Sequence, residues 1–514
     1  MDGTNHHNRY HNRMQSVTQN RLVRALALSL AAVLVAGSAT APVLAQPTGL
    51  PSLGSPAGAD LSPQLERKLG EAIMMQGRRD PTFIQDAEIT QYLNRMGHKL
   101  AAFVPSGAPD IDVFGVRDPI INAFAMPGGF IGINTGLIVA TGNESELAGV
   151  MAHEIAHVSQ RHIARGLTQQ KQSAHIALAA IAASLLAAMT GQGQLAAGVA
   201  AFGQAAAVDR QLGFSRDAER EADRVGFEML RKAGYDPNGM AQMFGRLMNA
   251  SRLNEGMGGG VYATTHPLSI DRMTDMQNRA RQHAAARYRD SDDYWYVRAK
   301  SRIIQAEDPQ LLRASIDQLS DETRTQSGVR RSAAWYGLSV AALRQKKTQE
   351  AARNLDQAVA GQPASHFLAL QKVDIELARK DFTAALQTAQ EGFKRWPDQR
   401  ALALRVGMAL QLLGRDKDAV EFLAAQVKRW PTQEPQLYQM LANGQERLGK
   451  MVDSRQSMSR YYLLTGAFVA AMSQLQQARG MTQDFYQQSQ IDVEIRLVRQ
   501  KMVEERQLLE RFKS

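Results

Sequence analysis

The chain contains no cysteine among its 514 residues. This absence excludes disulfide bonds and a lipid-modified cysteine anchor, so the fold depends on its hydrophobic core and on any metal it binds. Aromatic residues are sparse at 6%, whereas alanine, leucine and glutamine are plentiful, which favours helices. Long blocks of lysine and arginine and nucleic-acid motifs are missing too. The net charge of +10 is therefore diffuse, and we expect no nucleic-acid partner.

Apolar runs long enough to span a membrane are also lacking. The run ALALSLAAVLVAG follows Arg21 and Arg24 and has about 13 residues, whereas a spanning helix needs roughly 20. Small residues precede the bond after Ala45, as is typical of a signal peptide. We therefore expect residues 1–45 to be a signal peptide, cleaved on export. Residues 46–60 are rich in proline, glycine and serine, and we expect a flexible leader there.

A second apolar tract covers residues 174–208 and is dominated by alanine. Its first half reaches only about 16 apolar or small residues before TGQGQ interrupts it, which is short for a membrane span. We interpret the tract as a helical hairpin against a catalytic domain. The alternatives are a transmembrane pair and a lid or peripheral membrane contact near the active site, since the tract joins the two predicted metal-binding segments described below.

The periodicity of the sequence changes several times along the chain. Helical spacing begins near Leu61, and then IDVFGV and NAFAMPGGFIGIN predict two or three short strands. Helix returns at Asn143, which can cap the helix while Glu146 acts as its capping-box partner.

This last helix carries the motif His153-Glu154-x-x-His157. Residues four apart lie one turn above each other, so both imidazoles can bind one tetrahedral zinc ion. Glu154 projects about 100° round from His153, where it can take a proton from an attacking water. His162 is one residue out of register with the third histidine of the metzincin pattern, and we interpret it as an exposed helix residue.

A third ligand is expected from FSRDAEREADRVGFEML, in which Glu219 and Asp223 lie four apart. Glu219 would complete a His-His-Glu site for one Zn²⁺ per chain, with an open position. Asp223 could accept the second ring N–H of a ligating histidine and so hold its tautomer. Taken alone this stretch would be an exposed charged helix face, but beside the first motif it predicts a metal site.

Four motifs in this order resemble the gluzincin family of the CAAX prenyl endopeptidase and HtpX. They are HExxH, the second helix with its Glu and Asp, TTHPLSIDR with His266 and Arg272, and NAFAMPGG ahead of the catalytic helix. The resemblance spans roughly residues 61–278. One departure is that the two namesakes span the membrane several times, whereas this chain has no comparable set of spans.

The resemblance implies roles for individual residues. Zinc would bind His153, His157 and Glu219, with Glu154 as general base. His266 and Arg272 would stabilise the oxyanion or occupy the open metal position. Apart from the resemblance, we expect the NAFAMPGG strand to hold extended substrate by β-addition, through Asn122, Ala123, Phe124, Ala125, Gly128 and Gly129.

After about residue 290 a 34-residue period appears. It is carried by Ala351, Ala385 and Ala419 and by Pro363, Pro397 and Pro431. FKRWP and VKRWP recur in the same register, and this pattern is the tetratricopeptide signature, clearest over about 330–431. Stacked helix pairs of this kind form a solenoid whose concave surface binds polypeptides.

We therefore predict a mostly α protein, with an α+β zinc metallopeptidase domain over 61–285 and an α-solenoid over 290–514. An exported gluzincin with such repeats resembles the periplasmic quality-control proteases of Gram-negative bacteria. That resemblance implies hydrolysis of unfolded or stalled outer-membrane proteins, with the repeats docking on the β-barrel assembly machinery. The alternative is a chaperone or assembly scaffold that acts through its repeats, with a latent protease.

Overall fold

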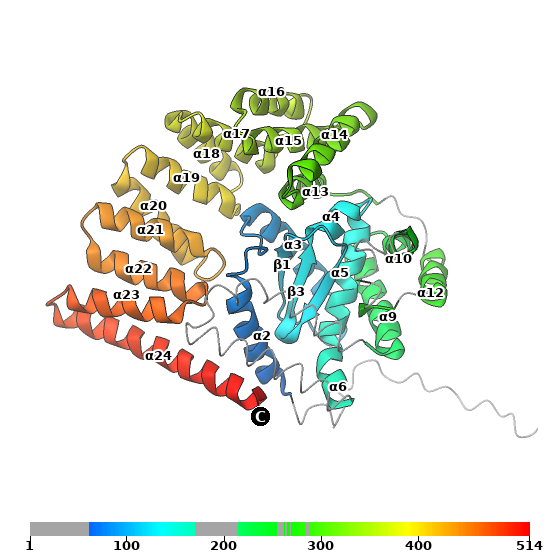
Figure 1. Cartoon of the computed structure of the whole chain (residues 1–514), viewed down its shortest axis with the longest axis horizontal. Coiled ribbons are helices and arrows are strands. Elements are labelled where there is room, and N and C mark those ends of the chain that lie inside the picture. Colours follow the sequence, from blue (N-terminus) through cyan, green and yellow to red (C-terminus); the bar gives the residue numbers. More distant parts are fainter. Residues whose placement is uncertain are drawn as a thin grey trace, which may run out of the picture. The chain divides into compact units, whose positions relative to one another are not determined.

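The computed structural model of the protein describes residues 61–169, 214–253, 262, 265–267, 269–283 and 288–513. The predicted signal peptide, the leader and the 174–208 tract lie outside these residues. Within them the fold is mostly helical with one small sheet, as predicted (Figure 1). None of the described helices is both long and apolar enough to cross a membrane.

The sheet has three strands, which agrees with the two or three expected. They are β1 (Asp112–Val116), β2 (Ala123–Met126) and β3 (Phe130–Asn134), in the order β1-β3-β2. β3 pairs parallel with β1 and antiparallel with β2. The turn η2 (Pro127–Gly129) joins β2 to β3 with Gly128 and Gly129 at positive φ, where a side chain would collide with the backbone of the neighbouring segments.

The central helix α5 (Glu144–Ser159) carries the HExxH motif and is buried from Glu144 to His157. Asn143 caps it by accepting a hydrogen bond from the Glu146 amide, while the Glu146 carboxylate accepts one from the Gly142 amide. Around α5 and the sheet lie α2 (Pro63–Gly77), α3 (Ala87–Ala101), α4 (Thr135–Ala140), α6 (His162–Gln169), α9 (Arg216–Lys232), α10 (Asn238–Leu253) and α12 (Ile270–Arg281).

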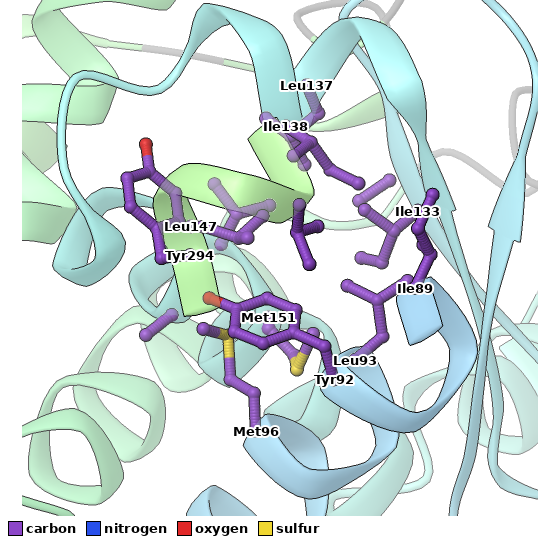
Figure 2. Close-up of a cluster of buried hydrophobic side chains, with 14 of the residues drawn as sticks. Ile89, Tyr92, Leu93, Met96, Ile133, Leu137, Ile138, Leu147, Met151 and Tyr294 are labelled. Atoms are coloured by element: carbon purple, nitrogen blue, oxygen red, sulfur yellow. The ribbon is translucent and has the colours of Figure 1, made fainter. Parts of the chain in front are cut away.

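The buried side chains of α3, the sheet and α5 form the core beneath the site. Figure 2 shows Ile89 and Leu93 of α3 facing Ile133 of β3, with Met151 of α5 close by. Apolar residues recur on α3 at helical spacing, and burying that face against the sheet and α5 stabilises all three elements.

A close approach of α5 and α9 brings together the two segments that the sequence predicts to bind metal. A Cβ atom added at Gly226 of α9 would lie 3.1 Å from the carbonyl oxygen of Ala152 and 3.1 Å from the amide nitrogen of His153. Only a residue without a side chain lets the two backbones come this near without a shift. Gly226 thereby places the face of α9 that bears Glu219 and Asp223 beside His153.

From residue 292 onward, consecutive helices pack against one another as pairs. They are α13 (Asp292–Gln305), α14 (Pro309–Thr325), α15 (Gly328–Arg344), α16 (Thr348–Val359), α17 (His366–Ala378), α18 (Phe382–Arg395), α19 (Arg400–Leu412), α20 (Asp416–Arg429), α21 (Pro435–Arg447), α22 (Met451–Leu464), α23 (Phe468–Gly480) and α24 (Phe485–Lys513). Ala351, Ala385 and Ala419 occupy equivalent positions in α16, α18 and α20 and are fully buried. The 34-residue period in the sequence therefore reflects a packing position that recurs from one helix pair to the next.

The hydrophobic core continues from the sheet into the first repeat helices. One buried cluster contains Leu93 of α3, Met151 of α5, Tyr294 of α13 and Phe367 of α17. Lys300 of α13 forms ion pairs with Asp86, at 2.6 Å, and with Glu88 at the start of α3. The sequence pattern changes at 285–290, where the domain boundary was predicted. The hydrophobic core, however, continues across this point.

Candidate metal centre

Four side chains from three separate segments converge at the middle of α5. His153, His157, Glu219 and His266 each offer one donor atom, and these atoms lie within 4.8 Å of one another. Nε2 of His153 lies 3.0 Å from Nε2 of His157 and 3.3 Å from Nδ1 of His266. Oε1 of Glu219 lies 3.1 Å from Nδ1 of His266 and 3.4 Å from Nε2 of His157. All four residues are buried.

This donor set fits a zinc ion. Bonds of about 2.0–2.1 Å place the ligand atoms of a tetrahedral zinc ion about 3.3–3.4 Å apart, and the separations here run from 3.0 to 3.4 Å. A neutral imidazole nitrogen has either one proton or one lone pair, so it can form one hydrogen bond. Nε2 of His153 has three polar neighbours, the donor atoms of His157, Glu219 and His266, and cannot form a hydrogen bond with each of them. A cation at their centre satisfies all of them.

Two further residues hold the ligands from outside. Asp223 lies one turn after Glu219, and its Oδ1 is 3.0 Å from Nδ1 of His153. Arg272 of α12 binds both oxygens of Asp223, at 2.6 and 2.8 Å, and its Nη1 lies 2.7 Å from Oε2 of Glu219. The Arg272 guanidinium is thus held by two carboxylates and orients them.

The two carboxylates of α9 are kept ionised by their cationic neighbours. Burial by itself raises the pKa of Glu219, but the charge of His266 and hydrogen bonds from His153 and His157 hold it well below its usual value. Burial likewise raises the pKa of Asp223, and hydrogen bonds from Arg272 and His153 lower it by more. Both groups therefore carry the negative charge that a metal ligand and its supporting partner need.

Glu154 is fully buried beside this cluster. Its Oε1 accepts a hydrogen bond from the Tyr262 hydroxyl at 3.3 Å and lies 3.6 Å from Nε2 of His266. Within the described residues its Oε2 has no hydrogen-bond partner. Burial raises the pKa of Glu154, and the neighbouring His266 and His153 offset part of that rise. A carboxylate with one oxygen held and one free is suited to receive a proton.

The expectation that His162 is exposed is wrong. The side chain is buried, with Nδ1 2.9 Å from Nδ1 of His157 and Nε2 3.1 Å from Oε2 of Glu221. The helix is interrupted at Arg161, whose φ is 54°, so a new helix begins at His162. This break turns His162 back toward His157, where a continuous helix would point it elsewhere.

Tyr262 and Phe214 also belong to the site and were not expected from the sequence. The Tyr262 ring stacks on His266 with ring centroids 4.6 Å apart, and the Phe214 ring lies 3.9 Å from that of His157. Tyr262 precedes His266 by four residues, a helical spacing that could have flagged it. Phe214 stands just before the capping Ser215 of α9 and gives no such signal.

The strand predicted to bind substrate lies beside α5. β2 pairs with β3 along one edge, and in the described chain no other strand pairs with it. Its residues Ala123 to Met126 are buried, and Asn122 just before it is 3% exposed. A small apolar cavity adjoins His153 and is lined in part by Met240, Met243, Phe244 and Leu247.

An HExxH helix and a glutamate from a second helix define a zinc metallopeptidase of the gluzincin type. Comparison with known proteins agrees, since residues 87–280 match peptidase family M48. A provisionally named β-barrel assembly-enhancing protease of Vibrio cholerae serotype O1 is 36% identical, over 63% of this chain and 67% of its own. The β-barrel assembly-enhancing protease of Yersinia pestis is 30% identical, over 88% and 91%. That of Escherichia coli (strain K12) is 29% identical, over 96% and 99%.

The chain therefore belongs to peptidase family M48, in the group of the β-barrel assembly-enhancing proteases. It is a metallopeptidase that acts on polypeptides, and its cofactor is zinc. The four converging side chains fit one such ion.

Proposed function

We propose that this protein is an exported zinc endopeptidase of the periplasm that hydrolyses misassembled outer-membrane proteins. The relatives named for β-barrel assembly support that role, as do the signal-peptide pattern and the repeats. The observation that carries the enzymatic part is the convergence of four donor atoms beside the buried carboxylate of Glu154. A scaffold with a latent protease is not favoured, because the full ligand set and the base are present.

In this proposal His153, His157 and Glu219 hold the metal, and Glu154 moves the proton. Zinc, when bound, supplies positive charge that polarises the scissile carbonyl and makes water more acidic. The Tyr262 hydroxyl holds Oε1 of Glu154, which leaves Oε2 to accept a proton from the attacking water. Glu154 then delivers that proton to the leaving amine.

His266 has two candidate roles, and its position favours one of them. Its Nδ1 lies among the ligand atoms, 3.3 Å from Nε2 of His153 and 3.1 Å from Oε1 of Glu219. An imidazole in that place fills the position that the attacking water needs, which supports a gate. In the second role the ring would move aside and stabilise the oxyanion. Arg272 then acts through the carboxylates that it orients.

Substrate would lie extended along β2, in the segment Asn122–Gly129. The strand has a second edge with no strand on it among the described residues, and it packs on α5 next to the motif. Backbone hydrogen bonds at such an edge bind a peptide without regard to its sequence. The small apolar cavity beside His153 would receive an apolar side chain near the scissile bond.

The repeats would dock clients or the outer-membrane β-barrel assembly machinery. Two features support a binding role, namely the 34-residue period and the paired helices that continue from α13 to α24. Repeats of this kind bind polypeptides over an extended surface and leave the chemistry to an attached domain.

A substitution at Glu154 tests the function directly. Glu154→Gln should retain zinc and the folded structure but lose peptide hydrolysis, because only the proton acceptor is removed. Casein cleavage and self-cleavage report activity, and a pull-down of this variant should trap outer-membrane proteins. Glu228→Gln, on the outer face of α9, is the matched control and should cleave normally. Normal cleavage by Glu154→Gln would refute the mechanism, whereas a trapped set without outer-membrane proteins would refute only the client class.

A further inference from the structure

Four side chains in contact with one another form a row that leads from His157 to the protein surface. His157 contacts His162, at 2.9 Å between the two Nδ1 atoms, and Nε2 of His162 lies 3.1 Å from Oε2 of Glu221. Arg165 donates a hydrogen bond of 2.8 Å to the same oxygen of Glu221. The His162 side chain is 1% exposed and that of Glu221 is 29% exposed. None of these three partners reaches the cluster of donor atoms itself.

The backbone is arranged to bring His162 to this place. α5 ends at Ser159, and Arg161 takes the left-handed conformation, φ 54°, which is uncommon for a residue other than glycine. Its guanidinium donates hydrogen bonds to the Leu61 carbonyl oxygen, at 2.5 Å, and to Oε2 of Glu66, at 3.3 Å. Contacts to a distant segment therefore hold the turn that directs His162 inward.

The positions of the protons follow from the geometry. Nε2 of His157 faces the other donor atoms, so it must present a lone pair to a metal, and the ring proton stays on Nδ1. That N–H lies 2.9 Å from Nδ1 of His162 and donates to it, so His162 carries its own proton on Nε2. The Nε2–H of His162 donates to the Glu221 carboxylate. Each of these ring protons therefore has one acceptor, and the negative charge of Glu221 is paired with Arg165.

The two histidines of the motif are therefore supported in different ways. Nδ1 of His153 meets a carboxylate directly, because Asp223 is 3.0 Å away. Among the described residues His157 has no carboxylate at that distance from its Nδ1, and it reaches Glu221 through a second imidazole. A ligating histidine needs its outer N–H bound in order to keep its tautomer and ring orientation, and His162 meets that need.

We propose that His162 and Glu221 are positioning residues for the metal centre: they hold His157 in the tautomer and orientation that binds zinc. The inference rests on the proposed assignment of His157 as a ligand. Removing such a partner typically lowers metal affinity by about 10–100-fold. The effect should be visible in zinc affinity itself, without reference to peptide hydrolysis.

The test compares two substitutions of equal shape in the full-length Glu154→Gln protein, which does not cleave itself. His162→Leu removes the acceptor, whereas His162→Asn offers a side-chain oxygen to the N–H of His157. Zinc affinity is measured by competition with a chelating dye, and the visible spectrum of the Co²⁺-loaded protein reports the ligand geometry. We expect His162→Leu to lose about 10–100-fold in affinity and His162→Asn to recover most of it. Equal loss in both variants, or affinity within about twofold of the parent in both, would overturn the proposal.

A double-mutant cycle with Glu221 separates the chain of hydrogen bonds from a simple charge effect. Glu221→Ala should lower zinc affinity in the parent background but not in the His162→Leu background, because its influence passes through His162. Asp217→Ala is the control, because it removes one charge from the same helix at a side chain that is 92% exposed. Its effect on zinc affinity should be the same in the parent and in the His162→Leu background. Additive losses from His162→Leu and Glu221→Ala would overturn the proposal. Should His162→Leu fail to fold, the cycle is run with His162→Asn, in which the link to Glu221 is broken and the Glu221→Ala effect should again vanish.

His157→Ala serves as the reference for the ligand assignment. It should abolish tight zinc binding. Full binding by His157→Ala would overturn the ligand assignment, whereas full binding by His162→Leu alone would overturn only the positioning role.

Discussion

Nδ1 of His266 lies 3.1 Å from Oε1 of Glu219, although 47 residues separate the two in the chain. The ring is fully buried, and Tyr262 stacks on it. Nδ1 of His266 thus lies among the candidate ligand atoms, and its Nε2 is 3.6 Å from Oε1 of Glu154. In the proposed metal site, an imidazole in this place would fill the position that the attacking water needs, close to the Glu154 carboxylate.

Replacing His266 by alanine should raise unregulated cleavage, including self-cleavage, while zinc stays bound through the three remaining ligands. The reason is that the fourth position becomes open to water. Casein hydrolysis and elemental analysis of the same sample measure the two effects, and His98→Ala, a change at an exposed histidine of α3, is the control. A fall in rate of about 10²–10³-fold with zinc retained would instead assign His266 to the oxyanion.

Glu219→Gln should lose most of its zinc. The substitution removes the only carboxylate among the four donors, and it leaves the Nη1 of Arg272 facing a neutral amide. Elemental analysis after purification measures the metal content, with Glu228→Gln on the outer face of the same helix as control. If Glu219→Gln kept one zinc per chain, another residue would have to be the third ligand.

Lys300→Met should destabilise the protein by about 3–5 kcal/mol, because it leaves the buried Glu88 and the half-buried Asp86 without their shared cation. Since one core runs from α3 into the repeat helices, the catalytic region and the first repeats should lose stability together. Urea unfolding followed by circular dichroism measures the change. Lys372→Met, at a lysine of α17 whose side chain is 60% exposed, should alter the free energy of unfolding by less than about 1 kcal/mol. Similar losses in the two variants would contradict the proposed coupling.

Glu434→Gln should alter how stability depends on pH. Burial raises the pKa of Glu434 from 4.5 to about 7, although Arg400 beside it opposes the rise. Between these two values the folded state binds more protons than the unfolded state, so stability falls as pH rises from about 4.5 to 7 and stays at its lower level above 7. The Gln variant cannot titrate, so it should be more stable than the parent at pH 8 and show a flatter profile.

Thermal unfolding at pH 5 and pH 8 measures this difference. Glu421→Gln, an exposed change on α20, should leave the profile of the parent unchanged. A parent profile without any decline across this window would show that Glu434 is ionised in the folded protein.

The sequence by itself determined the features that depend on a regular period. The 3.6-residue turn places His153 with His157, and Glu219 with Asp223, whatever the rest of the fold does. The recurrence of alanine and proline every 34 residues likewise identified the repeats, because each unit packs through the same positions. The expectation that His266 joins the site came from family resemblance, since no local period connects it to α5.

Only the tertiary structure decided which residues beyond these periods meet. His162 follows His157 by five residues, and helical geometry would turn it away. It faces His157 because Arg161 adopts positive φ, and that conformation is held by contacts to Leu61 and Glu66, about a hundred residues earlier in the chain. In the same way Gly226 sets which face of α9 approaches α5, through a backbone contact with Ala152. Contacts of this kind depend on segments far apart in sequence, and no local pattern records them.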